Sequence, residues 1–361
     1  MPRKTSEKQL SLRQMARMRV ARGIRVAHHN RIDQDQDRES GISDENSPQE
    51  TGRVVAHFGL NVEVEDATGA RFRCAVREAL LNDPVCGDEV IWQRVGDSQG
   101  VIVALRERRS MLQRPGPYQR LLTVAANVDR IVVVAAGNGF NPGLVDRYLV
   151  AAGKAGIRPV LVINKMDLVT DPALLEAALQ PYGRMGYGVF QVSVLLDAGL
   201  TTLEEALAGL TAVFVGESGV GKSSLVGRWV QDETLKTAEV HSSTGQGRHA
   251  TTTARLYRLP RGGLLIDSPG VREFGLHGVV REEIPGLFLD MRPFLGSCRF
   301  SDCRHLREPG CALRGAVASG DVSEIRLASL LRLMESVPSK NPFGSPGGAA
   351  RDGNDRGQKM V

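Results

Sequence analysis

The sequence lacks any run of about 18 apolar residues, the length that a membrane-spanning helix needs. Its amino terminus also lacks the short apolar core of a secretory signal peptide. Cysteine is scarce, with five in 361 residues, and three of these fall between positions 298 and 311. This distribution indicates metal ligation and argues against the disulfide framework of a small secreted protein. We therefore expect a cytoplasmic protein with no membrane partner.

The composition is that of a globular protein with a basic surface. The chain is long enough for two or three domains, and 42% of its residues are hydrophobic. A net charge of +5 and an isoelectric point near 9.1 favour a polyanionic partner, nucleic acid before a membrane surface.

Both ends of the chain have the composition of disordered segments. Between Arg3 and Arg31 almost every charge is positive, and a polar, acidic run follows to residue 50. We expect residues 1–50 to be disordered, and the basic part is also typical of an arm that orders on RNA. Residues 337–361 are rich in Gly, Pro and polar residues, and we expect a second disordered tail there.

Residues 51–108 show short alternating apolar runs separated by turn signals. Five short strands in so few residues are typical of an OB-type barrel, a fold that often binds oligonucleotides, although an SH3-like barrel has a similar pattern. The basic, proline-containing residues 106–117 are expected to form a linker. The expected strands are 53–58, 60–65, 70–76, 89–95 and 101–105.

From 109 to 276, strand-like and helix-like runs alternate, which predicts a parallel sheet covered by helices on both faces. One helix is expected to begin at Pro172 with Asp171 as its N-cap. The expected strands are 131–135, 159–163, 188–192, 211–215, 255–259 and 263–266, and the other helices cover 144–152, 203–208 and residues from 224.

Residues 277–336 are expected to form a mostly helical metal-binding domain. Its longest predicted helix covers 322–336, and the spacing of Ile325, Ala328 and Leu331 predicts that they face the core.

The segment Gly216 to Ser224 reads GESGVGKSS and fits the phosphate-loop pattern G-x-x-x-x-G-K-[S/T]. A strand-like run precedes it and a helix-like run follows, so the N–H groups of a helix amino terminus would receive phosphates. Lys222 is expected to act in catalysis by reaching the β and γ phosphates, and Ser223 to ligate Mg²⁺. The alternative is a glycine turn in an ordinary α/β protein. The expected nucleotide-binding residues here are Gly216, Glu217, Ser218, Gly219, Val220, Gly221, Lys222, Ser223 and Ser224.

A guanine-binding motif follows an earlier strand. Asn164, Lys165, Met166 and Asp167 form an N-K-x-D sequence directly after the predicted strand 159–163. Asp167 can accept hydrogen bonds from the ring N–H and the exocyclic amine of guanine, a pair that adenine does not offer. We therefore expect GTP and GDP, and not ATP, with Ser193 supporting the guanine ring.

Asp267 to Gly270 fit the D-x-x-G turn, with Asp267 near Mg²⁺ and Gly270 near the γ phosphate. Thr251 and Thr252 precede this turn, and one of them is expected to complete the Mg²⁺ shell. The guanine motif comes before the phosphate loop, whereas ordinary small GTPases have the opposite order. The sequence therefore predicts a circularly permuted GTPase, in which Asp267–Gly270 leads directly into the carboxyl-terminal domain and could transmit a switch movement to it.

Cys298, Cys303, His305 and Cys311 have the spacing C-x4-C-x-H-x5-C. Three thiolates and one imidazole are the ligands of a closed structural zinc site, which would stabilise a small domain. The alternative is three free buried cysteines beside a surface histidine. Cys74 and Cys86, in the predicted barrel, are expected to be ordinary core residues.

Taken together, these residues resemble the RsgA (YjeQ) family of ribosome-dependent GTPases over about residues 51 to 336. The resemblance rests on the permuted motif order, the zinc pattern, the turn at 84–90, Asn127-Val-Asp129 and Gly247-Arg248-His249. It implies a GTPase that docks on the small (30S) ribosomal subunit and its rRNA late in maturation and is stimulated by the subunit. It also implies that the barrel and the zinc domain contact RNA. We expect a monomer with one Zn²⁺, and with Mg²⁺ bound with GTP.

The water-orienting residue is expected to be His249. Many GTPases have a glutamine directly after the D-x-x-G turn, but this chain has Val271, which cannot orient water. The family resemblance also suggests His249, although a loop histidine could instead contact RNA. The chain has Ala250 where the family commonly has a threonine, which leaves open whether Thr251 or Thr252 binds Mg²⁺.

Three other functions remain open from the sequence. One is a nucleotide-gated RNA-binding protein whose hydrolysis is incidental. The others are a permuted GTPase that acts on the large ribosomal subunit and an ATPase.

Overall fold

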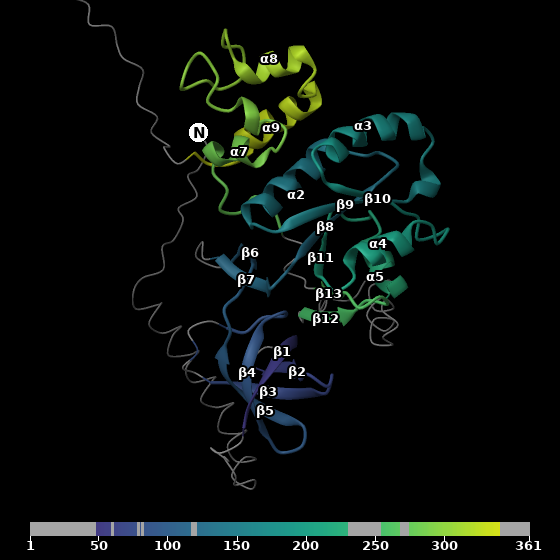
Figure 1. The fold of residues 1–361 in the computed structure, drawn as a ribbon, viewed down its shortest axis with the longest axis vertical. Helices are drawn as coiled ribbons and strands as arrows, with labels where there is room; N and C mark the ends of the chain where they lie inside the picture. The colour runs from purple at the N-terminus through teal and green to yellow at the C-terminus, as the bar shows by residue number, and fades with distance from the viewer. Residues whose placement is uncertain are drawn as a thin grey trace, which may run out of the picture.

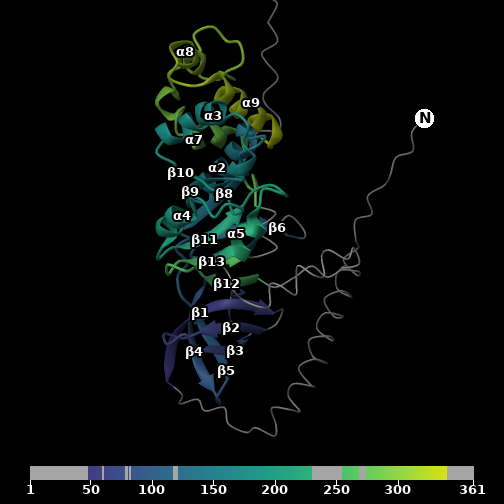
Figure 2. The same ribbon diagram turned by 90° about the vertical axis from the view of Figure 1, so that its right-hand side faces the viewer.

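The computed structural model describes residues 48–58, 61–77, 80, 83–116, 121–229, 254–267 and 274–339. Three parts follow one another along the molecule: a strand barrel at one end, a central sheet with helices, and a helical region at the other end (Figure 1 and Figure 2). The disorder expected at both chain ends falls almost entirely outside the described residues. In the parts of the chain that are described, none of the helices has the length and hydrophobicity that crossing a membrane requires.

The barrel has the five strands that the sequence predicts. Strand β1 pairs with β2 and β4, β2 with β3, and β5 with both β3 and β4, so the order β1-β2-β3-β5-β4 closes on itself. This is the five-stranded OB-type arrangement, and Trp92, Phe72 and Cys74 are buried inside it. The strands are β1 (Gln49–Phe58), β2 (Asn61–Glu65), β3 (Arg71–Val76), β4 (Glu89–Val95) and β5 (Gln99–Leu105).

The central sheet has the order β10-β9-β8-β11-β13-β12, and only β12 runs antiparallel to its neighbour β13. Short loops and helices join its parallel strands, as the alternating sequence pattern predicts. The strands are β8 (Arg130–Ala136), β9 (Arg158–Asn164), β10 (Gly188–Gln191), β11 (Thr211–Val215), β12 (Ala254–Arg258) and β13 (Leu264–Asp267).

Helices cover both faces of this sheet, as expected. Apolar residues of α2 and α3 share one core with the sheet, and those of α4 and α5 share a second core on the opposite face. Helix α3 begins at Pro172, and the Asp171 carboxylate accepts from the Leu174 N–H at 3.0 Å, which confirms the predicted N-cap. The helices are α2 (Pro142–Lys154), α3 (Pro172–Arg184), α4 (Leu200–Leu207) and α5 (Lys222–Trp229).

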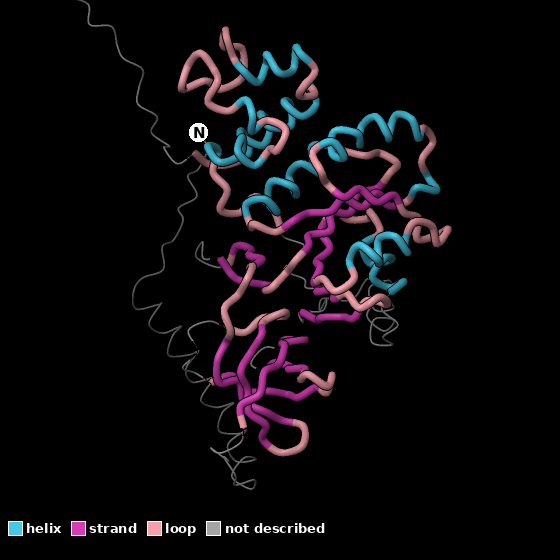
Figure 3. The backbone as a smooth tube through the Cα atoms, in the orientation of Figure 1, coloured by secondary structure: helices cyan, strands magenta, loops and turns pink. Residues whose placement is uncertain are grey.

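The prediction of a linker over 106–117 was wrong in part. Strand β6 (Met111–Pro115) pairs with β7 (Leu121–Ala126) as a separate antiparallel hairpin. Pro115 is tolerated because it lies at the end of β6, where a missing N–H costs little. Figure 3 shows this hairpin between the barrel and the central sheet.

Two contacts between described residues help to join the barrel to the central sheet. At the first, β1 pairs with β12 through Ala56↔Arg255 and His57↔Ala254, so one hydrogen-bonded ribbon runs through both parts. At the second, the Asn127 amide donates to the Gly87 carbonyl at 2.9 Å. Gly87 has φ +92, and a Cβ there would lie 2.1 Å from a backbone oxygen, so this contact needs glycine.

The helical region contains α7 (Ile284–Leu287), α8 (Ala312–Ser319) and α9 (Glu324–Ser336). The predicted core face of α9 was wrong in part: Ile325 is 57% exposed, whereas Leu331 packs against the core and Arg326, Leu327 and Leu330 are buried. The reason is an ion pair, because Arg326 turns inward to contact the buried Asp146 of α2, and it also pairs with Asp290 at 2.9 Å.

Candidate nucleotide site and metal cluster

The predicted nucleotide motifs meet at one edge of the central sheet. Because β9, β10, β11 and β13 run parallel, their carboxyl ends lie at the same edge, which is where such sheets bind ligands. Asn164 ends β9, Gly216 follows β11 and Asp267 ends β13, while Ser193 lies two residues beyond β10.

The phosphate-loop segment joins a fully buried strand to a helix. All five residues of β11 are buried, and α5 begins at Lys222 directly after the loop. Gly216 has φ +142, and a Cβ there would lie 2.2 Å from the Val134 carbonyl oxygen, so the loop packs tightly on β8. The Lys222 ammonium donates to the Gly216 carbonyl at 2.8 Å, which directs it across the loop, and Ser223 is exposed on the first helical turn.

Asn164 ties the guanine motif to the phosphate-loop segment. Its buried side-chain N–H donates to the Val220 carbonyl at 2.9 Å. Gly221 has φ +95, and a Cβ at this position would lie 2.2 Å from the Asn164 amide nitrogen. The third glycine of the loop is therefore required for this close approach.

Asp167 and Ser193 lie together, because the Ser193 hydroxyl donates to the Asp167 carboxylate. The same hydroxyl accepts from the Leu196 N–H at 3.2 Å, so Ser193 fixes both Asp167 and its own loop. Lys165 has φ +60, an uncommon conformation for a residue with a side chain and one that is often found at functional sites.

Four predicted site residues lie outside the described parts of the chain: His249, Thr251, Thr252 and Gly270. Within the D-x-x-G turn, the structure describes Asp267, which ends β13 opposite Arg255 of β12.

The predicted metal ligands form one cluster. The ligand atoms of Cys298, Cys303, His305 and Cys311 all lie within 4.8 Å of one another. His305 Nδ1 is 3.6 Å from the Cys298 sulfur and 3.5 Å from the Cys311 sulfur. Burial lowers the pKa of His305, which favours the neutral imidazole that ligates metals. The four side chains are therefore arranged to hold one cation.

The sequence did not assign roles to Asp129 and Arg109, which support the phosphate-loop strand. The Asp129 carboxylate accepts from the Thr211 N–H, the first residue of β11, at 2.9 Å, and Arg109 pairs with it at 2.8 Å. Asn127, two residues before Asp129, donates to the Gly87 carbonyl in the barrel turn. The Asn127-Val-Asp129 motif was the available signal, and only the fold shows that it joins barrel and sheet.

A glycine loop between a buried strand and a helix, with a guanine-type motif on an earlier strand, defines a circularly permuted P-loop GTPase. The family model "RsgA GTPase" matches residues 105–277. The chain is 47% identical over 294 residues to the small ribosomal subunit biogenesis GTPase RsgA of Pseudomonas aeruginosa, covering 81% of this chain and 86% of that protein. The chain therefore belongs to the RsgA GTPase family.

Two solved structures have a similar fold. The crystal structure of YjeQ from Thermotoga maritima aligns with a TM-score of 0.65 and 29% identity, covering 80% of this chain and 99% of that one. YloQ, described as a circularly permuted GTPase, aligns with a TM-score of 0.65 and 27% identity over 82% and 98%.

Proposed function

We propose that this protein binds the small (30S) ribosomal subunit and hydrolyses GTP during its late maturation, and that the subunit stimulates hydrolysis. The observation that carries the proposal is the 47% identity to a small ribosomal subunit biogenesis GTPase over most of both chains. The basic composition and the OB-type barrel support a partner made of RNA. We also propose that it acts as a monomer in the cytoplasm, with functional units over 51–108, 109–276 and 277–336.

In the proposed reaction, positioning and electrostatics supply most of the catalysis, because the transition state of phosphoryl transfer is loose and rich in charge. The loop amides from Gly216 to Ser224 and the Lys222 ammonium would hold the phosphates. The exposed Ser223 hydroxyl and Asp267 fit a magnesium site, together with Thr251 or Thr252. Bound Mg²⁺ would neutralise charge on the phosphates.

Base selection is assigned to Asp167, whose carboxylate would accept from the N–H groups of guanine. Its hydrogen bond from Ser193 leaves the second carboxylate oxygen for the base. Asn164 would act through the loop, since it binds the Val220 carbonyl.

We propose that His249 orients the attacking water once the subunit has positioned it. A His249→Ala variant is expected to bind GTP and the subunit normally but to lose most of the subunit-stimulated turnover. Full stimulated turnover in this variant would reject the role.

The cysteine–histidine cluster is proposed to hold one structural Zn²⁺. Zn–S distances of about 2.3 Å and a Zn–N distance of about 2.1 Å place S and N about 3.6 Å apart in a tetrahedron. The His305 separations of 3.5 and 3.6 Å fit this value. Four protein ligands leave no open position, so the ion would stabilise the region between Cys298 and α8.

The proposal is tested by measuring GTP hydrolysis with and without small ribosomal subunits, with large subunits and ATP as controls. Strong stimulation by small subunits alone, with ATP inert, is the expected result. If no ribosomal particle stimulates the enzyme, nucleotide-gated RNA binding becomes the better function. A Lys222→Ala variant separates these two, because a gate needs only bound GTP, whereas an enzyme cycle needs turnover for release.

A further inference from the structure

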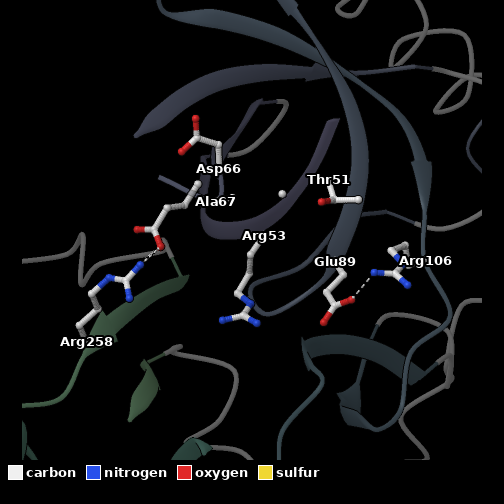
Figure 4. A pocket seen from close by; sticks show the side chains of 9 residues that line it. Thr51, Arg53, Asp66, Ala67, Glu89, Arg106 and Arg258 are labelled. Atoms are coloured by element: carbon white, nitrogen blue, oxygen red, sulfur yellow. Dashed lines mark hydrogen bonds and ion pairs between the residues drawn. The ribbon is translucent and has the colours of Figure 1, made fainter. Parts of the chain in front are cut away.

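The cavity at the seam between the barrel and the central sheet has no part in the nucleotide site. It has a volume of about 340 Å³, and it is lined by residues of the barrel and by Arg258 of β12. Ligand pockets of this size are common where two structural units meet. Figure 4 shows Arg53 between Arg258 on one side and Arg106 on the other.

Charged side chains form a row across the cavity wall. In strand register, Arg53 of β1 lies opposite Glu89 of β4 and Glu65 of β2, and Glu65 lies opposite Arg71 of β3. Residues in register across neighbouring strands point to the same face of a sheet. The cavity therefore opens onto an alternating row of acidic and basic groups.

Each carboxylate that lines the cavity already has a cationic partner. Arg258 pairs with Glu65, and Arg106 pairs with Glu89 at 3.1 Å. Asp66 pairs with Arg94 at 2.8 Å and accepts three further hydrogen bonds from its own turn.

The Arg53 guanidinium is different. It makes no hydrogen bond and no ion pair within the described parts of the chain. The unused binding capacity of the cavity is therefore that of a cation with a planar fork of N–H donors, which suits a bidentate anion such as a phosphate.

We propose that this cavity binds a phosphate group of the RNA backbone, with Arg53 as its main donor. RNA is the source we favour because the cavity lies on an OB-type barrel in a basic protein; this assignment rests on the proposed function. The site has a further consequence, because Arg258 is on β12, which begins directly after Thr251–Thr253. A phosphate held here would contact both the barrel and the strand that follows the proposed switch threonines.

Arg53→Gln tests this site, because glutamine keeps the Cβ–Cδ part of the side chain and a polar end but removes the guanidinium and its charge. Arg184→Gln is the matched control, since Arg184 is exposed at the end of α3, makes no ion pair with any residue that the structure describes and lies far from the barrel. Arg53→Lys keeps the positive charge but lacks the planar set of N–H donors. Unchanged thermal unfolding and unchanged basal GTP hydrolysis would establish that each variant is folded.

Two affinities are measured for each variant. The first is the small-subunit concentration that gives half-maximal stimulation of GTP hydrolysis. The second is the affinity for a single-stranded oligouridylate of about ten nucleotides, measured by fluorescence anisotropy over a range of salt concentrations. Arg53→Gln is expected to weaken both about tenfold and to reduce the salt slope by about 0.7, the loss of one phosphate contact. Arg53→Lys should recover only part of the loss, and Arg184→Gln should match the wild type.

Equal affinities of wild type and Arg53→Gln for small subunits, for oligouridylate and for inorganic phosphate would overturn the site. Weaker binding of inorganic phosphate alone, with both RNA affinities unchanged, would overturn RNA as the source of the phosphate. The proposed function is tested separately. It fails if the wild-type protein shows no stimulation by small subunits, whatever effect Arg53→Gln has on oligouridylate binding.

Discussion

Replacing Arg326 with alanine is expected to loosen the helical region from the central sheet. Arg326 is 3% exposed, and its partner Asp146 is fully buried on α2. The guanidinium also binds Asp290 through two hydrogen bonds, at 2.9 and 3.0 Å, and lies 4.5 Å from the Phe288 ring centre. Removing one partner of such a pair leaves an uncompensated buried charge, which costs about 3–5 kcal/mol.

This magnitude can be measured locally, because α9 shares a core with α2 and the central sheet. We expect hydrogen exchange of the slowest α9 amides to become roughly two to four orders of magnitude faster in Arg326→Ala. Arg332→Ala is the matched control on the same helix. Its side chain is exposed and, among the described residues, bonds only to the Ala328 carbonyl, so we expect a change within about 0.5 kcal/mol.

The loss should also depend on pH. Burial raises the pKa of Asp146 in the folded protein, and Arg326 opposes this shift, so removing Arg326 raises the pKa further. A raised folded-state pKa contributes stability at low pH that is lost as the pH rises through it. The stability difference between wild type and Arg326→Ala is therefore expected to grow as the pH rises above the ordinary aspartate pKa of 3.8.

Two results would refute this reasoning. One is an α9 exchange rate in Arg326→Ala that equals that of Arg332→Ala. The other is a double variant, Asp146→Asn with Arg326→Met, whose destabilisation equals the sum of its two single changes, because paired groups are expected to be strongly non-additive.

Gly221→Ala should reduce the affinity for a fluorescent GTP analogue more than tenfold, because its Cβ would lie 2.2 Å from the Asn164 amide nitrogen at φ +95. Wild-type affinity in this variant would show that the close contact between Gly221 and Asn164 is not needed. Asp167→Asn should weaken GTP binding at least about tenfold and favour the xanthine nucleotide, measured by competition, and an unchanged base preference would exclude Asp167 as the base-reading group. Cys311→Ser, or treatment with a strong chelator, should release one zinc per chain and speed hydrogen exchange around α8; a chain that carries no metal by elemental analysis would contradict the metal site.

The elements that the sequence predicted well are those whose signals are local. Strand β11 is bounded as expected, and Asp171 caps α3, because a short apolar run and an N-cap followed by proline each identify an element without tertiary context. The gathering of Asn164, Gly216 and Asp267 at one sheet edge also followed from the alternating pattern.

The features that the sequence did not predict depend on distant partners. The inward turn of Arg326 requires Asp146, which is 180 positions earlier, so helical spacing alone placed Ile325 in the core. Strand β6 forms by pairing with β7, and the basic residues and prolines around it indicated a linker instead of a strand. The seam of β1 with β12 joins residues almost 200 positions apart, and no local pattern reports such a pairing.

The seam between β1 and β12 also protects the sheet. Strand β12 is the last strand of the central sheet on that side, and its outer edge would present unpaired N–H and C=O groups if the barrel were removed. Exposed edges of this kind are templates for pairing with other chains. The barrel thus acts as a cover that keeps the GTPase sheet from self-association, and a fragment without residues 48–105 would be prone to aggregate through β12.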